Sequence, residues 1–316
     1  MMISRLLKLM LKERWHTKDN MNVDLNKLGT ETRNEKTLLL DTLSTKEIIE
    51  IMNEEDLNVI GAIKKALPKI ELLIEQTIKA YNDGGRIIYI GAGTSGRLGL
   101  MDAVEVVPTF NCDRFVGLIA GGDRAFVKAV EGAEDSKELA IEDLKNLGLN
   151  DKDIVIGIAA SGRTPYVIGG LDYAKEVGAK TGSVCCNLDT EISRHADYPV
   201  EVSAGPEVLT GSTRLKSGTC QKIILNMIST ATMVGVGKVY GNLMIDVKAT
   251  NEKLVERCHK IVMEATGCDY EMADKALKET DNSCKIAIVM IMFGLEKDEA
   301  AKALADAKGF IRNIKE

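Results

Sequence analysis

The sequence predicts an α/β fold in which a doubly wound, five-stranded parallel sheet carries helices on both faces. Short apolar runs rich in β-branched residues alternate with helical patterns through the middle of the chain. Continuous apolar runs are typical of strands buried on both faces, as in parallel sheets. The strand signal then stops near residue 250, and only short helical patterns follow. We therefore expect a small C-terminal helical domain after the sheet.

The alternating region divides into five strands and five helices. The expected strands are 86–90, 114–120, 153–159, 181–186 and 198–202. The expected helices are 96–106, 124–132, 136–146, 165–177 and 216–236. Ligands of such sheets bind beside the carboxyl ends of the strands, so a site is expected in the turns that follow them.

The remaining segments flank this region. Residues 1–22 are interpreted as a disordered tail or an upstream start, with Met21 as an alternative start. Ser44-Thr-Lys-Glu47 matches a capping box, which predicts a helix through Ile51. A second helical pattern covers 57–81, with Pro68 as a break or a new first turn.

Two domains are expected after the tail, one over 23–250 and one over 251–316. The second should contain four helices, near 251–265, 269–279, 284–293 and 297–306.

Composition excludes several classes of function. The 316 residues carry a net charge of −6 without a basic tract, which argues against nucleic acid as the main partner. No stretch approaches the ~18 apolar residues of a membrane span. The seven cysteines show no C-x-x-C spacing, and their odd number does not indicate a disulfide framework, so a cytoplasmic location is expected. The three histidines are scattered, so no metal site is expected.

The first candidate site is Gly91-Ala-Gly-Thr-Ser-Gly96, between a strand and a helix that should stop before Pro108. It looks too rich in glycine to be strand or helix. Free N–H groups and the dipole of the following helix favour an anion there, most plausibly a phosphate beside Gly93, Thr94 and Ser95. The spacing also fits the dinucleotide fingerprint G-x-G-x-x-G. A phosphate monoester is favoured over NAD, because the acidic residue expected after the next strand comes late, at Asp123.

Two further hydroxyl-rich turns precede helices. The second contains Ser161, Gly162, Arg163 and Thr164, and the third runs from Thr210 to Thr219. A single serine or threonine would suffice to cap each helix, which is the alternative interpretation. Three turns with more hydroxyls than caps require could instead cradle one sugar phosphate. In the third turn, Ser212 and Thr213 would contribute hydroxyls, and Lys216 or Arg214 would add charge.

Among the carboxylates, Glu105 is the candidate that the residues alone favour. It lies among Ala103, Val104, Val106 and Val107, where burial would raise its pKa and suit it to general acid catalysis. The equally open alternative is an exposed position at the helix end. For Glu134, the residues alone favour a plain acidic first turn of a helix.

Six motifs, in order, resemble those of the bacterial N-acetylmuramic acid 6-phosphate etherases, and the similarity extends from about Leu28 to the end. The motifs are Gly91-Ala-Gly-Thr-Ser-Gly-Arg-Leu-Gly99, Leu118-Ile-Ala-Gly-Gly122, Glu131-Gly-Ala-Glu-Asp-Ser136, Gly157-Ile-Ala-Ala-Ser-Gly-Arg-Thr-Pro-Tyr166, Thr210-Gly-Ser-Thr-Arg-Leu-Lys-Ser-Gly-Thr219 and Asp246-Val-Lys-Ala-Thr-Asn-Glu-Lys253. The resemblance implies the sugar isomerase (SIS) fold, a homodimer and kinship with the glucokinase regulatory protein.

The resemblance also implies a carbon–oxygen lyase of cell-wall amino-sugar catabolism and peptidoglycan recycling. Such an enzyme cleaves the lactyl ether by elimination and hydration, giving N-acetylglucosamine 6-phosphate and D-lactate, without a metal or redox cofactor. The family's two important glutamates fall on Glu105, as the acid, and Glu134, as the base. The sequence departs from the family at Glu105-Val-Val-Pro-Thr109, where a second proline is frequent, and at Cys220, where alanine is common.

Two other classes of protein stay open on this fold. One is a non-catalytic sugar-phosphate sensor, and the other is an aldose–ketose phosphate isomerase, which would share the C2 deprotonation.

Overall fold

The computed structural model describes residues 29–128, 130–249 and 251–315, so the prediction for residues 1–22 lies outside the described part. Its centre is a five-stranded parallel sheet in the order β2-β1-β3-β4-β5. The strands are β1 (Ile87–Gly91), β2 (Phe115–Ile119), β3 (Ile154–Ala159), β4 (Lys180–Cys185) and β5 (Tyr198–Glu201). The predicted fold class and all five strands are confirmed, with ends that differ by at most one residue.

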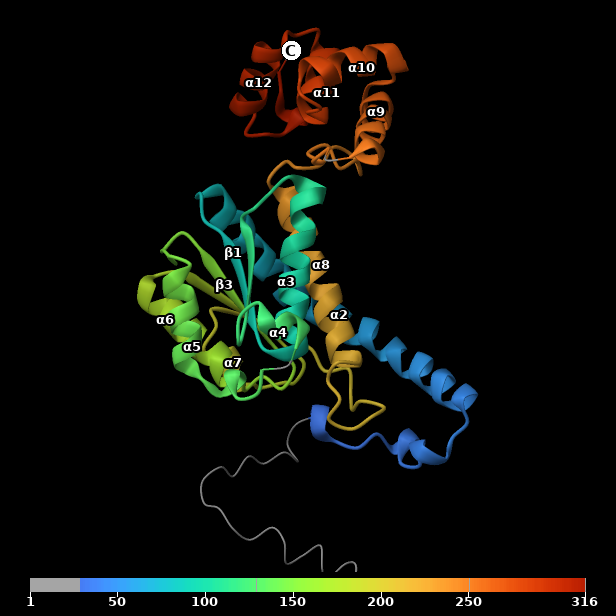
Figure 1. Cartoon of the computed structure of the whole chain (residues 1–316), viewed down its shortest axis with the longest axis vertical. Coiled ribbons are helices and arrows are strands. Elements are labelled where there is room, and N and C mark those ends of the chain that lie inside the picture. The colour runs from blue at the N-terminus through green and yellow to red at the C-terminus, as the bar shows by residue number, and fades with distance from the viewer. Residues whose placement is uncertain (1–28, 129, 250, 316) are drawn as a thin grey trace, which may run out of the picture.

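Helices cover both faces of the sheet (Figure 1). One face packs against α2 (Thr45–Asn82), α3 (Gly93–Phe110) and α8 (Lys216–Gly235), and the other against α5 (Lys137–Asn146) and α6 (Pro165–Val177). Strand residues alternate between the two cores: Ile87 and Tyr89 belong to the first, and Ile88 and Ile90 to the second. The short α4 (Arg124–Val127) and α7 (Glu191–Arg194) follow β2 and β4 along the chain.

The C-terminal helices form a cluster with its own apolar core (Figure 1). They are α9 (Glu252–Thr266), α10 (Tyr270–Glu279), α11 (Cys284–Phe293) and α12 (Lys297–Asp306), as predicted. Ile245 and Val247 already belong to this core, and the division at residue 250 stays a prediction. Short 3-10 turns complete the structure at Gly29–Glu31, Glu35–Thr37, Leu40–Thr42, Ala133–Asp135 and Ile311–Asn313. Among the described residues, no helix is both long and apolar enough to cross a bilayer.

The prediction of a break at Pro68 is wrong, because α2 runs without interruption from Thr45 to Asn82. The predicted capping box at Ser44 and Glu47 is present at its start. Proline costs the helix one hydrogen bond, to the carbonyl four residues earlier. Buried side chains on both sides of it, such as Ile63 and Ile70, hold the two halves against the same core.

The glycine-rich turn is also shorter than predicted, because α3 already begins at Gly93 and continues past Pro108 to Phe110. Glycine is tolerated inside this helix because the helix lies directly on the sheet. A Cβ added at Gly96 would lie 2.6 Å from the Gly91 carbonyl oxygen, and one at Gly99 would lie 2.9 Å from the Tyr89 Cβ.

The helix predicted at 124–132 is confined to Arg124–Val127. The backbone becomes extended at Lys128, and Gly132 adopts a left-handed conformation with φ of +77°. The residues that follow α4 therefore form a loop beside the carboxyl end of β2 rather than a further helical turn.

Asp102 is a buried carboxylate in the middle of α3. Its Oδ2 accepts a hydrogen bond from the Tyr89 hydroxyl at 3.2 Å, and its Oδ1 accepts one from the Ser229 hydroxyl at 3.1 Å. Burial raises the pKa of Asp102 to about 6, although the charge of Lys222 and these two hydrogen bonds act in the opposite direction. The folded protein therefore binds a proton here more tightly than the unfolded chain does.

We expect the Asp102→Asn variant to be more stable than the wild type at pH 8. A raised carboxyl pKa costs stability as the pH rises through about 6, and a neutral amide avoids that cost while keeping an oxygen acceptor. The free energy of unfolding should rise by about 1–3 kcal/mol at pH 8, and this difference should vanish near pH 4. Urea unfolding at both pH values measures it, with exposed Asp113→Asn as the control. A difference that does not change with pH would contradict the role of Asp102.

Candidate active site

The structure brings the three predicted turns together at the carboxyl edge of the sheet. The Ser95 hydroxyl donates to Gln221 Oε1 of α8 at 2.9 Å, and a Cβ added at Gly218 would lie 3.6 Å from Thr94 Cγ2. These contacts join the first turn to the third. The second turn joins them through Cys186, whose N–H donates to the Ala160 carbonyl at 3.1 Å and whose thiol lies 3.5 Å from the Ser217 carbonyl oxygen.

The three helix N-termini at this edge differ in what occupies them. No side chain caps α3 or α6, so the first N–H groups of these helices stay open toward the turns. At α8, the buried Glu207 carboxylate accepts hydrogen bonds from the N–H groups of Lys216 and Ser217, both at 2.9 Å. An anion is therefore favoured at α3 and α6, while α8 already holds a carboxylate of the protein itself.

Lys216 does not present a free charge to this edge, contrary to the prediction. Its side chain is 2% exposed, and its Nζ donates to Glu55 Oε2 of α2 at 2.7 Å. Lys36 and Asn34 also contact the Glu55 carboxylate, at 3.0 and 2.9 Å. The sequence reasoning missed Glu55 and Glu207, because neither lies in a motif that distinguishes it from other glutamates.

The other predicted binding residues lie in the turns as expected. Gly162 adopts φ of +74°, and a Cβ there would come within 2.3 Å of Thr190 Cγ2, so only glycine fits. The remaining predicted residues of the second and third turns are all half-buried: Ser161, Arg163, Thr164, Ser212 and Thr213. The Ser95 hydroxyl, in contrast, is buried against Gln221, which leaves the N–H groups of this turn as its donors toward a ligand.

Glu134 and Gly93 line one cavity of about 200 Å³ beside the ends of β1 and β2. Glu134 belongs to the 3-10 turn Ala133–Asp135 and is exposed. The plain interpretation, an acidic first turn of a helix, fits this 3-10 turn but not α5, which begins only at Lys137. Its carboxylate instead shares the cavity with the open N-terminus of α3.

Of the two positions left open for Glu105, burial among valines or exposure, the single chain has the exposed one. The buried carboxylate of this helix is Asp102, one turn earlier, because that face of α3 packs against β1 and α8. Glu105 also lies twelve residues beyond Gly93, which is roughly 18 Å along the helix axis. Within one chain, Glu105 therefore does not line the cavity that Glu134 lines.

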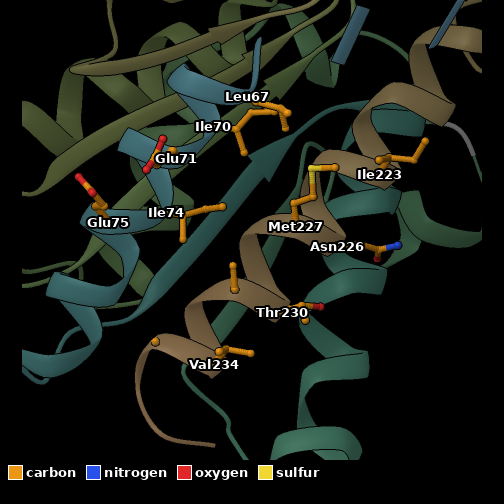
Figure 2. Close-up of a pocket in the computed structure, with 12 residues that line it drawn as sticks. Leu67, Ile70, Glu71, Ile74, Glu75, Ile223, Asn226, Met227, Thr230 and Val234 are labelled. Atoms are coloured by element: carbon orange, nitrogen blue, oxygen red, sulfur yellow. The ribbon is translucent and has the colours of Figure 1, made fainter. Parts of the chain in front are cut away.

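A larger hollow of about 930 Å³ lies elsewhere, between α2 and α8. Its lining is mainly apolar and includes Leu67, Ile70 and Ile74 of α2 and Met227 of α8 (Figure 2). It contains none of the predicted site residues. This groove is a surface on which an apolar partner could pack, rather than a site for a phosphorylated sugar.

The cysteines and acidic residues give no sign of a metal centre in the described part of the chain. All seven cysteines are free thiols, and six of them are buried. No group of three or more histidine, cysteine, aspartate or glutamate side chains gathers there in a way that could hold a metal ion.

Comparison with known proteins agrees with this arrangement. Residues 69–175 match the family described as glucokinase regulatory protein N-terminal SIS domain, and residues 135–231 match the SIS domain family. The fold and the turns at the carboxyl edge of its sheet thus define an SIS-domain protein.

Curated relatives identify the family within the SIS-domain proteins. A protein named N-acetylmuramic acid 6-phosphate etherase from an Exiguobacterium species is 59% identical over 91% of this chain and 99% of its own length. One named N-acetylmuramic acid 6-phosphate etherase 2 from Enterococcus faecalis is 58% identical over 92% and 99%. The chain belongs to the N-acetylmuramic acid 6-phosphate etherase family.

Among solved structures, phosphosugar isomerases cover part of this chain. A phosphoheptose isomerase from Francisella tularensis is 15% identical, with a TM-score of 0.48 over 60% of this chain and 98% of that one.

We expect Glu55→Gln to destabilise the protein, because it leaves the buried Lys216 ammonium without its carboxylate. Burial alone would raise the pKa of Glu55, but Lys216, Lys36 and Asn34 overcome it and lower the pKa to about 2. The stabilisation is thus fully present above the ordinary carboxyl pKa and is lost as the pH falls toward 2.

The free energy of unfolding should fall by about 3–5 kcal/mol at pH 7, and by less near pH 3.5. Chemical denaturation at the two pH values measures it, with the exposed neighbour substitution Glu54→Gln as the control. Equal unfolding free energies for Glu55→Gln and Glu54→Gln at pH 7 would rule out the ion pair as a stabilising contact.

Proposed function

We propose that this protein is a carbon–oxygen lyase that cleaves the D-lactyl ether of N-acetylmuramic acid 6-phosphate. The products are N-acetylglucosamine 6-phosphate and D-lactate. The observation that carries the proposal is the 59% identity to etherases, which extends over 99% of their length and therefore includes every turn of the site. The open N-terminus of α6 supports it, because uncapped N–H groups and neighbouring hydroxyls are what a phosphate monoester needs.

The reaction is an elimination followed by a hydration. The C1 aldehyde of the opened sugar makes the C2 proton acidic, and a base removes it. The electron pair forms the C2–C3 double bond as the C3–O bond breaks, and an acid protonates the departing lactate oxygen. Water then adds its hydroxyl group to C3 and a proton to C2, so that the ether is replaced by a hydroxyl.

Glu134 is the base in this proposal. Its carboxylate lines the cavity that Gly93 also lines, so a sugar whose phosphate is held by the turns would bring its ring carbons to this glutamate. The second turn, with Ser161 and Thr164 ahead of the uncapped α6, takes the phosphate.

Glu105 is the acid, and it acts from the second subunit of a homodimer. Within one chain it lies roughly 18 Å along α3 from Gly93, too far for both glutamates to reach one substrate. The apolar groove between α2 and α8 offers a surface for a second copy. Exposed Met101 and Val104 beside Glu105 would be covered by the same association, which would also desolvate the acid.

The enzyme works in the cytoplasm, in peptidoglycan recycling and N-acetylmuramate catabolism. Seven free thiols suit a reducing compartment, and a phosphorylated sugar does not cross a membrane unaided.

The first test is direct. The purified protein, incubated with N-acetylmuramic acid 6-phosphate, should release D-lactate at catalytic turnover, measured with a coupled lactate assay. Conversion of a hexose 6-phosphate without a lactyl group would indicate an isomerase instead. Stabilisation against heat by the substrate without turnover would indicate a sensor.

If one site takes Glu134 from one subunit and Glu105 from the other, two inactive variants should restore activity when they are mixed. Glu105→Gln and Glu134→Gln should each lose lactate release, because each lacks one partner in proton transfer. Mixed dimers formed after dissociation and reassociation should regain roughly a quarter of the wild-type activity, since half of the dimers are mixed and each has one intact site. Lactate release that stays absent in the mixture, with mixed dimers verified by native mass spectrometry, would place both glutamates in one chain's site.

A further inference from the structure

The cavity beside β1 and β2 combines one cation with small apolar walls. Arg97 lines it together with Ala92, Ala120, Ala125 and Val130, and the volume is about 200 Å³. That volume suits a substituent of a few heavy atoms rather than a whole sugar. The walls would accept a methyl group, and the guanidinium would accept an anion.

Arg97 is held in place by backbone carbonyls rather than by a carboxylate. Its Nε donates to the Phe126 carbonyl at 3.0 Å, and its Nη2 donates to the Ala125 carbonyl at 2.8 Å. These bonds use one edge of the planar group. The other edge consists of Nη1 and the second N–H of Nη2. It donates to no acceptor among the described residues, and Arg97 forms no ion pair with any of them.

A guanidinium fixed along one edge is suited to bidentate binding of a carboxylate along another. The carbonyls also keep it half-buried, where a charge interacts more strongly than in open water. The position thus supplies a prepared anion-binding group that the phosphate turns do not need.

We propose that this cavity holds the lactyl group of the substrate, with Arg97 binding its carboxylate and Ala92, Ala120, Ala125 and Val130 surrounding its methyl group. The inference rests on the proposed function, because only an etherase substrate carries this group. It makes Arg97 a substrate-binding residue that determines specificity for lactyl ethers over plain hexose phosphates.

The phosphate is a less suitable occupant of this cavity. Glu131 and Glu134 also line it, and they repel a phosphate dianion more strongly than the singly charged lactyl carboxylate, whose one charge Arg97 can balance. The phosphate has open N–H groups and hydroxyls at the second turn instead. The placement also agrees with the chemistry, since the lactyl oxygen is on C3, next to the C2 whose proton Glu134 removes.

The test compares two ligands that differ by the lactyl group. Arg97→Gln removes the charge but keeps an amide that can donate to the α4 carbonyls. We expect its KM for N-acetylmuramic acid 6-phosphate to rise roughly 10- to 100-fold. The inhibition constant of N-acetylglucosamine 6-phosphate, which lacks the carboxylate, should stay within about twofold.

The control is Arg124→Gln, which removes the same charge from an exposed position on α4 that does not line the cavity. It should change neither constant. A KM for the etherase substrate that stays unchanged in Arg97→Gln would overturn the inference, as would an equal weakening of both ligands, which indicates a structural role in anchoring α4.

The same comparison is available without turnover. The shift in unfolding temperature that each sugar phosphate produces in wild type and Arg97→Gln reports binding alone. A wild type that releases no lactate would refute the proposed function. If Arg97→Gln loses the shift produced by the lactyl-bearing sugar but keeps the one produced by N-acetylglucosamine 6-phosphate, Arg97 is still supported as the carboxylate ligand. If the lactyl-bearing sugar shifts wild type and Arg97→Gln equally, that role is refuted.

Discussion

The close approach of α3 to the sheet is the constraint on which the rest of the structure depends. Any side chain at Gly96 would collide with the Gly91 carbonyl, and Gly99 lies directly over Tyr89. Without side chains at these positions, the helix begins almost at the end of β1, and its first N–H groups stand at the carboxyl edge of the sheet. The glycines therefore contribute to the candidate site indirectly. They let the backbone come close enough to present donors where a longer turn would have moved them away.

Buried charges make the third turn at this edge different from the other two. Glu207 closes the N-terminus of α8, and Glu55 neutralises Lys216, so the third turn is held by ion pairs and hydrogen bonds within the protein. The first and second turns keep open helix ends. The donors of the third turn are thus already satisfied within the protein, whereas the first two turns keep unsatisfied N–H donors, where an anion is favoured.

The position of the two glutamates follows from the direction of α3. The helix starts at the site and runs back along the sheet, so a residue at its far end lies at the opposite edge from a residue in the loop after β2 (Figure 1). The proposed roles of the two carboxylates therefore call for a second chain, which would bring its own Glu105 to this edge. In that proposal, the apolar groove between α2 and α8 and the exposed apolar side chains next to Glu105 would be covered by the second chain.

The sequence by itself determined the alternation of strands and helices, the C-terminal helices and the turns that form the site, because apolar periodicity and glycine-rich turns act over a few residues. It also carried the motifs that indicated the family. Tertiary structure alone decided which charges are buried: Asp102 rather than Glu105, three residues apart on one helix, and Lys216 paired with Glu55, 161 positions away. Tertiary packing likewise decided that α2 continues through Pro68. Burial depends on what packs against a side chain, and the packing partners here come from segments that no local pattern connects.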